Sequence, residues 1–300
     1  MKMNTLSRRR FLAGVAASMA AAPLMQNARA ADNGEFPPLP RAVVHGMLPD
    51  DLSWEERYAL AARCGFEGVE APPFDNEDEA RRHADAAAEA GIHLHSVIFG
   101  GWRDPLSHAD ESVAAAGLNA LEMSIRGASI IGADAVLLVP GRVNAENRYV
   151  EVYERSQRRI REILPLAEEL EVVIAVENVW NDFLLSPLEF AQYVDEFESP
   201  WLRAYFDVGN VVAFGWPQDW IRTLGERIVK IHYKDFTRST RDWEALGEGD
   251  VDWVEVRRAL HEVGYDDFVT AELSDGDEAY LTDVAERMDR INRGVTVVES

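Results

Sequence analysis

Short apolar runs recur along the chain, and each is followed by a polar stretch with the spacing of an amphipathic helix. We count eight of them, near residues 41–47, 66–71, 92–98, 134–139, 172–178, 202–208, 228–234 and 268–273. Apolar, β-branched runs that alternate with helical patterns are typical of parallel strands buried on both faces. Eight strand–helix repeats of about 32 residues each predict an α/β fold with a single (β/α)8 barrel.

The predicted helices carry their own boundary signals. Glycine stands where four of them give way to a strand, at Gly65, Gly91, Gly132 and Gly264, and a left-handed glycine commonly ends a helix. Ser53, Ser186 and Asp252, each followed three residues later by glutamate, are predicted N-caps. The alternative fold is a doubly wound open sheet, which is disfavoured because no glycine-rich phosphate loop follows the first strand.

Residues 1–30 have the organisation of an export signal rather than of a barrel segment. A charged S-R-R-R-F-L stretch, with Arg8 and Arg9, precedes an alanine-rich apolar run and an A-x-A cleavage pattern at residues 28–30. The arginine pair matches the twin-arginine (Tat) signal. We therefore predict a Tat signal peptide at 1–30, a barrel domain at 31–300 and a mature protein in the periplasm or outside the cell. The twin-arginine translocase would be a partner during export, without stable membrane insertion.

The charge balance excludes one class of partner. The formal net charge is −23, and the five basic residues before position 31, with no acid among them, leave the rest of the chain at about −28. Such an acidic surface repels nucleic-acid backbones and anionic membranes. We therefore expect no nucleic-acid partner, while the sequence allows a homo-oligomer.

Four of the predicted strands end in a side chain that can bind a metal ion. These are Glu177, Asp207, His232 and Glu272, separated by 30, 25 and 40 residues. Because the C-terminal strand ends of a barrel converge on one face, we expect the four to meet. Singly, each could be a core histidine or a solvated carboxylate. Together they form a hard oxygen and nitrogen site that suits Mn²⁺, Mg²⁺ or Co²⁺.

At these motifs the chain resembles the xylose isomerase-like TIM-barrel superfamily of sugar isomerases and epimerases, over about residues 41–293. The motifs are V-E-N (176–178), F-D-V-G-N (206–210), I-H-Y-K-D (231–235), G-E-G-D-V-D-W (247–253) and A-E-L (271–273). The resemblance implies one divalent ion on the four ligands, with Mn²⁺ expected first and Mg²⁺, Co²⁺ or Zn²⁺ as alternatives. In the ketose 3-epimerase branch, the residues matching Glu177 and Glu272 are also the acid and base on opposite faces of the sugar.

Further positions follow from the same resemblance. An arginine six residues after the histidine contacts substrate in that branch, and Arg238 matches it. Asn210 stands where the branch usually has a substrate-contacting histidine, and Phe183 where it has a second glutamate. The endonuclease branch needs additional histidines and a glutamate after the fourth strand, where this chain has V-P-G (139–141). DNA repair is therefore disfavoured.

The predicted ligands define a reaction type. A divalent ion polarises a carbonyl and acidifies the neighbouring carbon, so a carboxylate can remove its proton to give an enediolate. Reprotonation on the other face is epimerisation, and return to the adjacent carbon is isomerisation. We predict an exported sugar isomerase or epimerase with an unphosphorylated sugar, keto-sugar or cyclitol as its partner. The alternatives are a lyase on a keto-sugar or keto-glycoside and a non-catalytic sugar-binding barrel.

Several other residues are candidates for the pocket. Trp102, after the F-G-G of 99–101, could stack on a sugar ring or be an exposed loop aromatic. His45, Glu70 and His95 lie near the first three strand ends and could line the pocket or be core or solvated residues. The charged, glycine-bearing segment 236–252 is predicted to be a lid or a disordered surface loop.

Overall fold

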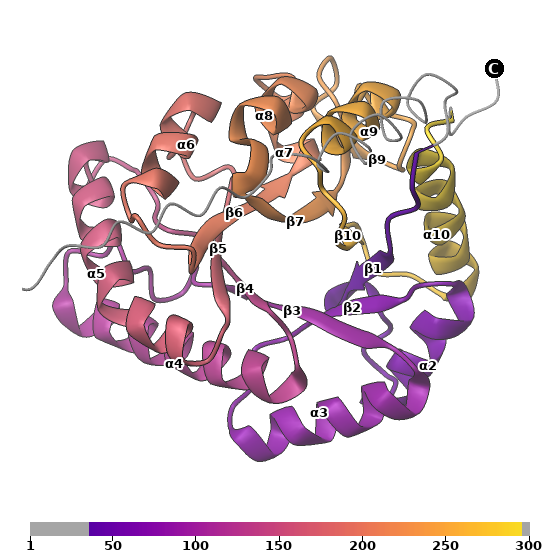
Figure 1. Cartoon of the computed structure of the whole chain (residues 1–300), viewed down its shortest axis with the longest axis horizontal. Coiled ribbons are helices and arrows are strands. Elements are labelled where there is room, and N and C mark those ends of the chain that lie inside the picture. Colours follow the sequence, from indigo (N-terminus) through magenta and orange to yellow (C-terminus); the bar gives the residue numbers. More distant parts are fainter. Residues whose placement is uncertain (1–35, 296–300) are drawn as a thin grey trace, which may run out of the picture. The chain divides into compact units, whose positions relative to one another are not determined.

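In the computed structural model, which describes residues 36–295, the chain folds around a closed barrel of eight parallel strands (Figure 1). They are β1 (Arg41–Val44), β2 (Gly68–Ala71), β3 (His93–Gly100), β4 (Ala135–Leu138), β5 (Val173–Glu177), β6 (Leu202–Asp207), β7 (Ile228–Tyr233) and β10 (Val269–Ala271). Around the ring the order is β1-β10-β7-β6-β5-β4-β3-β2, and Arg41 pairs with Val269 where the first strand meets the last. The predicted barrel is confirmed, and the open-sheet alternative is wrong.

Helices surround the barrel on its outer side (Figure 1). They are α2 (Trp54–Cys64), α3 (Glu77–Ala90), α4 (Glu111–Ile131), α5 (Tyr149–Glu169), α6 (Pro187–Asp195), α7 (Val208–Val212), α8 (Pro217–Leu224), α9 (Trp253–Glu262) and α10 (Glu278–Asn292), with 3-10 turns η1 (His45–Met47) and η2 (Gly225–Arg227). The turn η1 ends β1 at Val44, three residues before its predicted end, because a 3-10 turn leaves the strand ladder.

The predicted helix ends are confirmed. Left-handed φ angles of +94°, +70°, +77° and +78° occur at Gly65, Gly91, Gly132 and Gly264. Ser53, Ser186 and Asp252 each accept a hydrogen bond from the glutamate N–H three residues on. At α6 the Glu189 carboxylate accepts from the Leu185 N–H at 3.2 Å and not from the N–H of the cap residue Ser186, so only one of the two bonds of a capping box forms there.

The barrel interior is divided into an apolar and a polar side. A small cluster of Ala135, Leu137, Val139, Ala175 and Tyr205 fills the side formed by β4, β5 and β6. The opposite side carries polar groups that are also fully buried: Glu70, His95, Ser96, His232 and Thr270. Because a buried polar group requires a partner, this side of the barrel is built for interactions rather than for packing alone.

Segment 236–252 is ordered rather than a disordered loop. Strands β8 (Asp235–Thr237) and β9 (Asp242–Glu244) pair as an antiparallel hairpin. The buried Asp235 carboxylate fixes the base of the hairpin, because it accepts bonds from the N–H groups of Gly247 and Val251 and from the Trp253 indole, at 2.8, 3.3 and 2.8 Å. That the segment acts as a lid stays a prediction.

The predicted signal peptide, residues 1–30, lies outside the described residues, so its boundary with the barrel domain stays a prediction. Within residues 36–295, no helix combines the length and the hydrophobicity that crossing a membrane requires.

Candidate metal centre and sugar pocket

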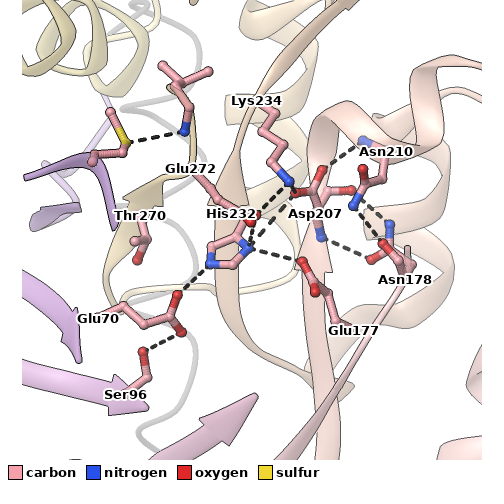
Figure 2. A network of polar contacts seen from close by, with 12 residues as sticks. Glu70, Ser96, Glu177, Asn178, Asp207, Asn210, His232, Lys234, Thr270 and Glu272 are labelled. Atoms are coloured by element: carbon pink, nitrogen blue, oxygen red, sulfur yellow. Dashed lines mark hydrogen bonds and ion pairs between the residues drawn. The ribbon is translucent and has the colours of Figure 1, made fainter. Parts of the chain in front are cut away.

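Four side chains predicted to be ligands meet at the C-terminal ends of β5, β6, β7 and β10 (Figure 2). One ligand atom from each of Glu177, Asp207, His232 and Glu272 lies within 4.8 Å of the others. The Nδ1 atom of His232 lies at their centre, 3.0 Å from Glu177 Oε1, 2.8 Å from Glu272 Oε2 and 3.9 Å from Asp207 Oδ2. The structure therefore brings together all four residues that the strand-end pattern singled out.

Local folding aims one oxygen of Asp207 at this cluster. The residue is the N-cap of α7, and its Oδ1 accepts the Asn210 N–H at 2.7 Å. The other oxygen, Oδ2, is buried and faces His232 and Lys234. Capping the helix thus fixes the orientation of the carboxylate, which is the pre-organisation that an ion site needs.

Two asparagines join the ends of β5 and β6 beside the cluster. Asn178 accepts the Asp207 N–H and donates to the Asp207 carbonyl, both at 2.9 Å. Asn210, predicted to contact substrate, lines the pocket, but its side-chain N–H donates to the Asn178 carbonyl at 3.0 Å. The Asn210 side chain therefore helps to hold the site together.

The second nitrogen of His232 has a carboxylate partner of its own. Nε2 lies 2.8 Å from Glu70 Oε2, and Glu70 Oε1 accepts from the Ser96 hydroxyl at 2.8 Å (Figure 2). A carboxylate at this nitrogen favours the tautomer that leaves Nδ1 free to bind an ion. Glu70 was a pocket candidate in the sequence, but its partner is 162 residues away, so only the closed barrel shows the contact. His95, also buried, pairs instead with Thr270 at 3.1 Å.

Lys234 is a site residue that the sequence reasoning missed. Its ammonium lies 2.6 Å from Glu272 Oε2 and 3.3 Å from Asp207 Oδ2. A signal for it was present: Lys234 follows His232 by two residues, which places both on one face of an extended strand. A further signal is that Lys234 is one of only two lysines after residue 30.

These residues fit a divalent ion. Asp207 Oδ2 and Glu272 Oε2 are buried without a hydrogen bond of good geometry, although the Lys234 ammonium is close to both. With Glu177 they give three carboxylates and an imidazole around one point. A single ammonium does not balance this charge, so a hard divalent cation is the group that the donor set suits.

Burial and charge shift the acidities within the cluster. Burial, together with the nearby Glu272, raises the pKa of Glu177 to about 7. Burial alone would raise the pKa of Glu272 too, but His232 and Lys234 outweigh it and hold that pKa well below its usual range. Two carboxyls facing the same imidazole nitrogen are thus held in different electrostatic environments.

A cavity of about 470 Å³ opens above the cluster. Its lining includes the polar residues Glu177, Glu272, His45 and Asn210 and the aromatic residues Phe99, Trp102, Trp180 and Trp243. Trp102 thus lines the pocket, and its stacking on a sugar ring stays a prediction. Arg238, the other predicted substrate contact, does not line this cavity: its guanidinium stacks on Trp216 and donates to the Gly215 carbonyl at 2.7 Å.

Another cavity, of about 310 Å³, lies at the N-terminal end of the barrel and away from the ligands. The buried Lys230 ammonium there pairs with Asp134 at 2.8 Å and Asp267 at 2.6 Å. The ammonium is thus paired with two carboxylates, and active sites of this fold lie at the opposite end, so we assign this cavity a structural role.

Comparison with known proteins matches residues 58–293 to the family described as xylose isomerase-like TIM barrel. SgbU of Escherichia coli K12, provisionally named an L-ribulose-5-phosphate 3-epimerase, is 30% identical over 238 residues, covering 73% of this chain and 82% of SgbU. UlaE of E. coli O1:K1, named an L-ribulose-5-phosphate 3-epimerase, is 27% identical over 241 residues, covering 76% and 84%.

Solved structures share the fold at lower identity. A structure of L-ribulose 3-epimerase superposes with a TM-score of 0.73 at 19% identity, covering 85% of this chain and 94% of that one. The apo form of the 3-keto-D-glucoside 4-epimerase YcjR of E. coli gives a TM-score of 0.73 at 13% identity, covering 83% and 98%. At these identities the likeness concerns the arrangement of the barrel.

Proposed function

Since the chain belongs to the xylose isomerase-like TIM barrel family, we propose that it is a metal-dependent sugar epimerase or isomerase that acts on an unphosphorylated sugar, keto-sugar or cyclitol. The observation that carries this proposal is the pair Glu177 and Glu272, which meet at one imidazole nitrogen from separate strands and both line the cavity. The named relatives at 27–30% identity are epimerases, which supports the isomerase class.

The four ligands would hold the ion, which when bound supplies the Lewis acidity that acidifies a carbon beside a substrate carbonyl. One of the two glutamates then removes the proton from that carbon. The other returns a proton, and return to the opposite face inverts the carbon, whereas return to the neighbouring carbon moves the carbonyl. The Lys234 ammonium, 2.6 Å from Glu272, holds this carboxylate in place and favours its charged form.

The charge of the cavity favours an unphosphorylated substrate. Of the described residues that line it, Lys234 alone carries a fixed positive charge, and its ammonium already pairs with Asp207 and Glu272. Phosphate groups are usually bound by arginine forks or free backbone N–H groups. This chain therefore differs in proposed substrate from relatives named for a sugar phosphate.

Export is part of the proposal. The arginine pair and the cleavage pattern in residues 1–30 support a place in the periplasm or outside the cell, reached through the twin-arginine translocase. Phosphorylated sugars are scarce there, which agrees with the charge of the cavity.

The test is proton exchange at a substrate carbon. Mature protein loaded with Mn²⁺ would be incubated in D₂O with a panel of unphosphorylated sugars, keto-glycosides and cyclitols, and each product followed by NMR. We expect deuterium to enter one carbon together with epimer or isomer formation. Elimination without either product would make the chain a lyase, and binding without any exchange would make it a sugar-binding barrel.

A further inference from the structure

Three tryptophans line the cavity above the proposed metal centre, and we call Trp102, Trp180 and Trp243 the aromatic rim. All three line the same cavity as Glu177 and Glu272. Their exposed fractions are 51%, 46% and 46%, so about half of each residue stays open. Large aromatic side chains left open beside a pocket are a common feature of binding sites.

Two members of the rim, Trp180 and Trp243, are held in place by their neighbours. The Trp180 indole N–H donates to the Asn210 carbonyl at 2.8 Å, and its ring stacks on Trp243 with centroids 5.0 Å apart and planes 25° apart. Phe236 packs edge-on against both rings, at 5.3 and 5.1 Å. Because these two side chains are already ordered, a ligand that binds against them pays little conformational entropy to fix their rotamers.

Trp102 reaches the same cavity through a glycine turn. Gly100 and Gly101 have φ angles of +70° and +84°, which only glycine adopts readily. A Cβ at position 100 would come within 3.2 Å of the Trp102 ring. The turn therefore lets the indole fold back towards the pocket.

A second cavity adjoins the one that Glu177 and Glu272 line. This cavity, of about 430 Å³, shares Lys234, Trp243 and Glu272 with the first and continues to Leu273 and Tyr280. Cavities of this size hold ligands larger than one small ring. The first cavity is lined by the three tryptophans as well as by the two glutamates, so a ligand whose reacting carbon lies at the glutamates also has an aromatic surface beside it.

We propose that the aromatic rim binds a second ring, so that the preferred substrate is a glycoside or disaccharide rather than a free monosaccharide. The C–H faces of a pyranose are apolar and stack on an indole, and an aryl group does the same, whereas a phosphate or a small polar chain gains nothing there. The proposal rests on the proposed function only for the ring that reacts at Glu177 and Glu272. It assigns the non-reacting ring to Trp102, Trp180 and Trp243.

The test compares matched ligands by calorimetry on the mature, Mn²⁺-loaded protein. The pairs are D-fructose with isomaltulose, D-glucose with cellobiose, and D-glucose with phenyl β-D-glucoside, so each pair differs by one added ring. We expect at least one two-ring ligand to bind about tenfold more tightly than its parent sugar. Trp180→Ala and Trp243→Ala should each reduce this ratio by about three- to tenfold.

The readout is the ratio of the affinities for the two-ring ligand and its parent sugar. A variant that only loosens the site weakens the binding of both ligands and leaves this ratio unchanged. Trp216→Ala is the matched control, since Trp216 is also an exposed tryptophan, at 59%, but lines neither cavity, and it should leave the ratio unchanged. No two-ring preference in the wild type, or a preference that survives both rim substitutions, overturns the proposal. A two-ring preference without deuterium exchange supports the rim while refuting the proposed reaction, so the two failures are distinguishable.

Discussion

Glu177 and Glu272 share one imidazole nitrogen but differ in their other neighbours. Glu272 also contacts the Lys234 ammonium, while Glu177 is more deeply buried and, among residues 36–295, has no lysine or arginine within hydrogen-bond distance. A pair of carboxyls in unlike surroundings is the usual basis for separate acid and base roles. The two positions therefore carry the most direct test of the chemistry.

We predict that Glu177→Gln and Glu272→Gln each reduce turnover by about a hundredfold or more, as for a lost general base. Glutamine keeps the size and one ligand oxygen, so both variants should retain substantial Mn²⁺ and sugar binding. Metal analysis, calorimetry and deuterium exchange check this together. Glu168→Gln, on the exposed face of α5, is the control and should behave as wild type. Normal turnover in both site variants would refute the two-base mechanism.

Glu70 offers a second residue-scale test because, in the described part of the chain, it contacts the proposed metal centre through His232 alone. We predict that Glu70→Leu weakens Mn²⁺ binding by about 10- to 100-fold, since the His232 Nε2–H loses its acceptor. Glu70→Gln keeps an acceptor oxygen and should recover much of the affinity. Titration of Mn²⁺ by calorimetry, with the melting temperature as a check on folding, measures both. Wild-type affinity in the leucine variant would assign Glu70 a packing role only.

At the scale of elements, the short helix α7 packs unusually close to the end of β7. A Cβ added at Gly209 would lie 2.9 Å from the Lys234 carbonyl and closer still to its Cβ. Glycine at this position therefore lets α7, whose N-cap is Asp207, lie directly against Lys234, which follows the strand β7 that carries His232. The position of α7 and the geometry of the site are coupled.

We predict that Gly209→Ala lowers the free energy of unfolding by about 1–3 kcal/mol, the usual cost of overpacking, and also weakens Mn²⁺ binding. Urea denaturation and metal titration measure the two effects. Gly46→Ala is the matched control, because nothing lies within 4 Å of the added Cβ and the φ of Gly46 is not left-handed. Its unfolding free energy should stay within about 0.5 kcal/mol of wild type. Equal effects in the two variants would contradict the close approach.

The elements that the sequence predicted are those with a local signal. The eight strands follow from apolar runs, and the glycine helix ends and the Ser53 cap follow from single residues in their own segments. The hairpin β8–β9 was missed, because its pairing depends on the buried Asp235 collecting bonds from residues up to 18 positions away. Contacts across the barrel, such as Glu70 with His232, have no local signal at all.

In the candidate site, too, residues with a local sequence signal were predictable and residues placed by distant contacts were not. Its four proposed ligands were predictable because each ends an apolar strand, and the barrel topology alone brings such ends together. The aromatic rim was predicted only at Trp102. Trp180, in the loop after β5, and Trp243, in strand β9, stack on one another although they lie 63 positions apart, and no local sequence pattern predicts such a contact.

At the scale of the whole molecule, the proposed export depends on two residues far from the chemistry. Replacing Arg8 and Arg9 together with lysine should trap the precursor in the cytoplasm, because the twin-arginine pathway reads this pair. The charge stays the same, so a general charge effect is excluded. Fractionation followed by immunoblotting measures the outcome, and normal secretion of the doubly substituted chain would refute the assignment.

The pairing of β1 with β10 sets an order of events during synthesis. The barrel cannot close until Val269 reaches Arg41, and the proposed ligand set is incomplete until Glu272 has been made. A ribosome delivers the chain from its N-terminus, so until then the incomplete sheet has unpaired strands at its two edges. An ion would therefore be acquired at the proposed site only after Glu272 has been made. A chain exported in the folded state would carry an ion that it bound in the cytoplasm. A chain exported unfolded would instead bind whichever suitable ion is most available outside.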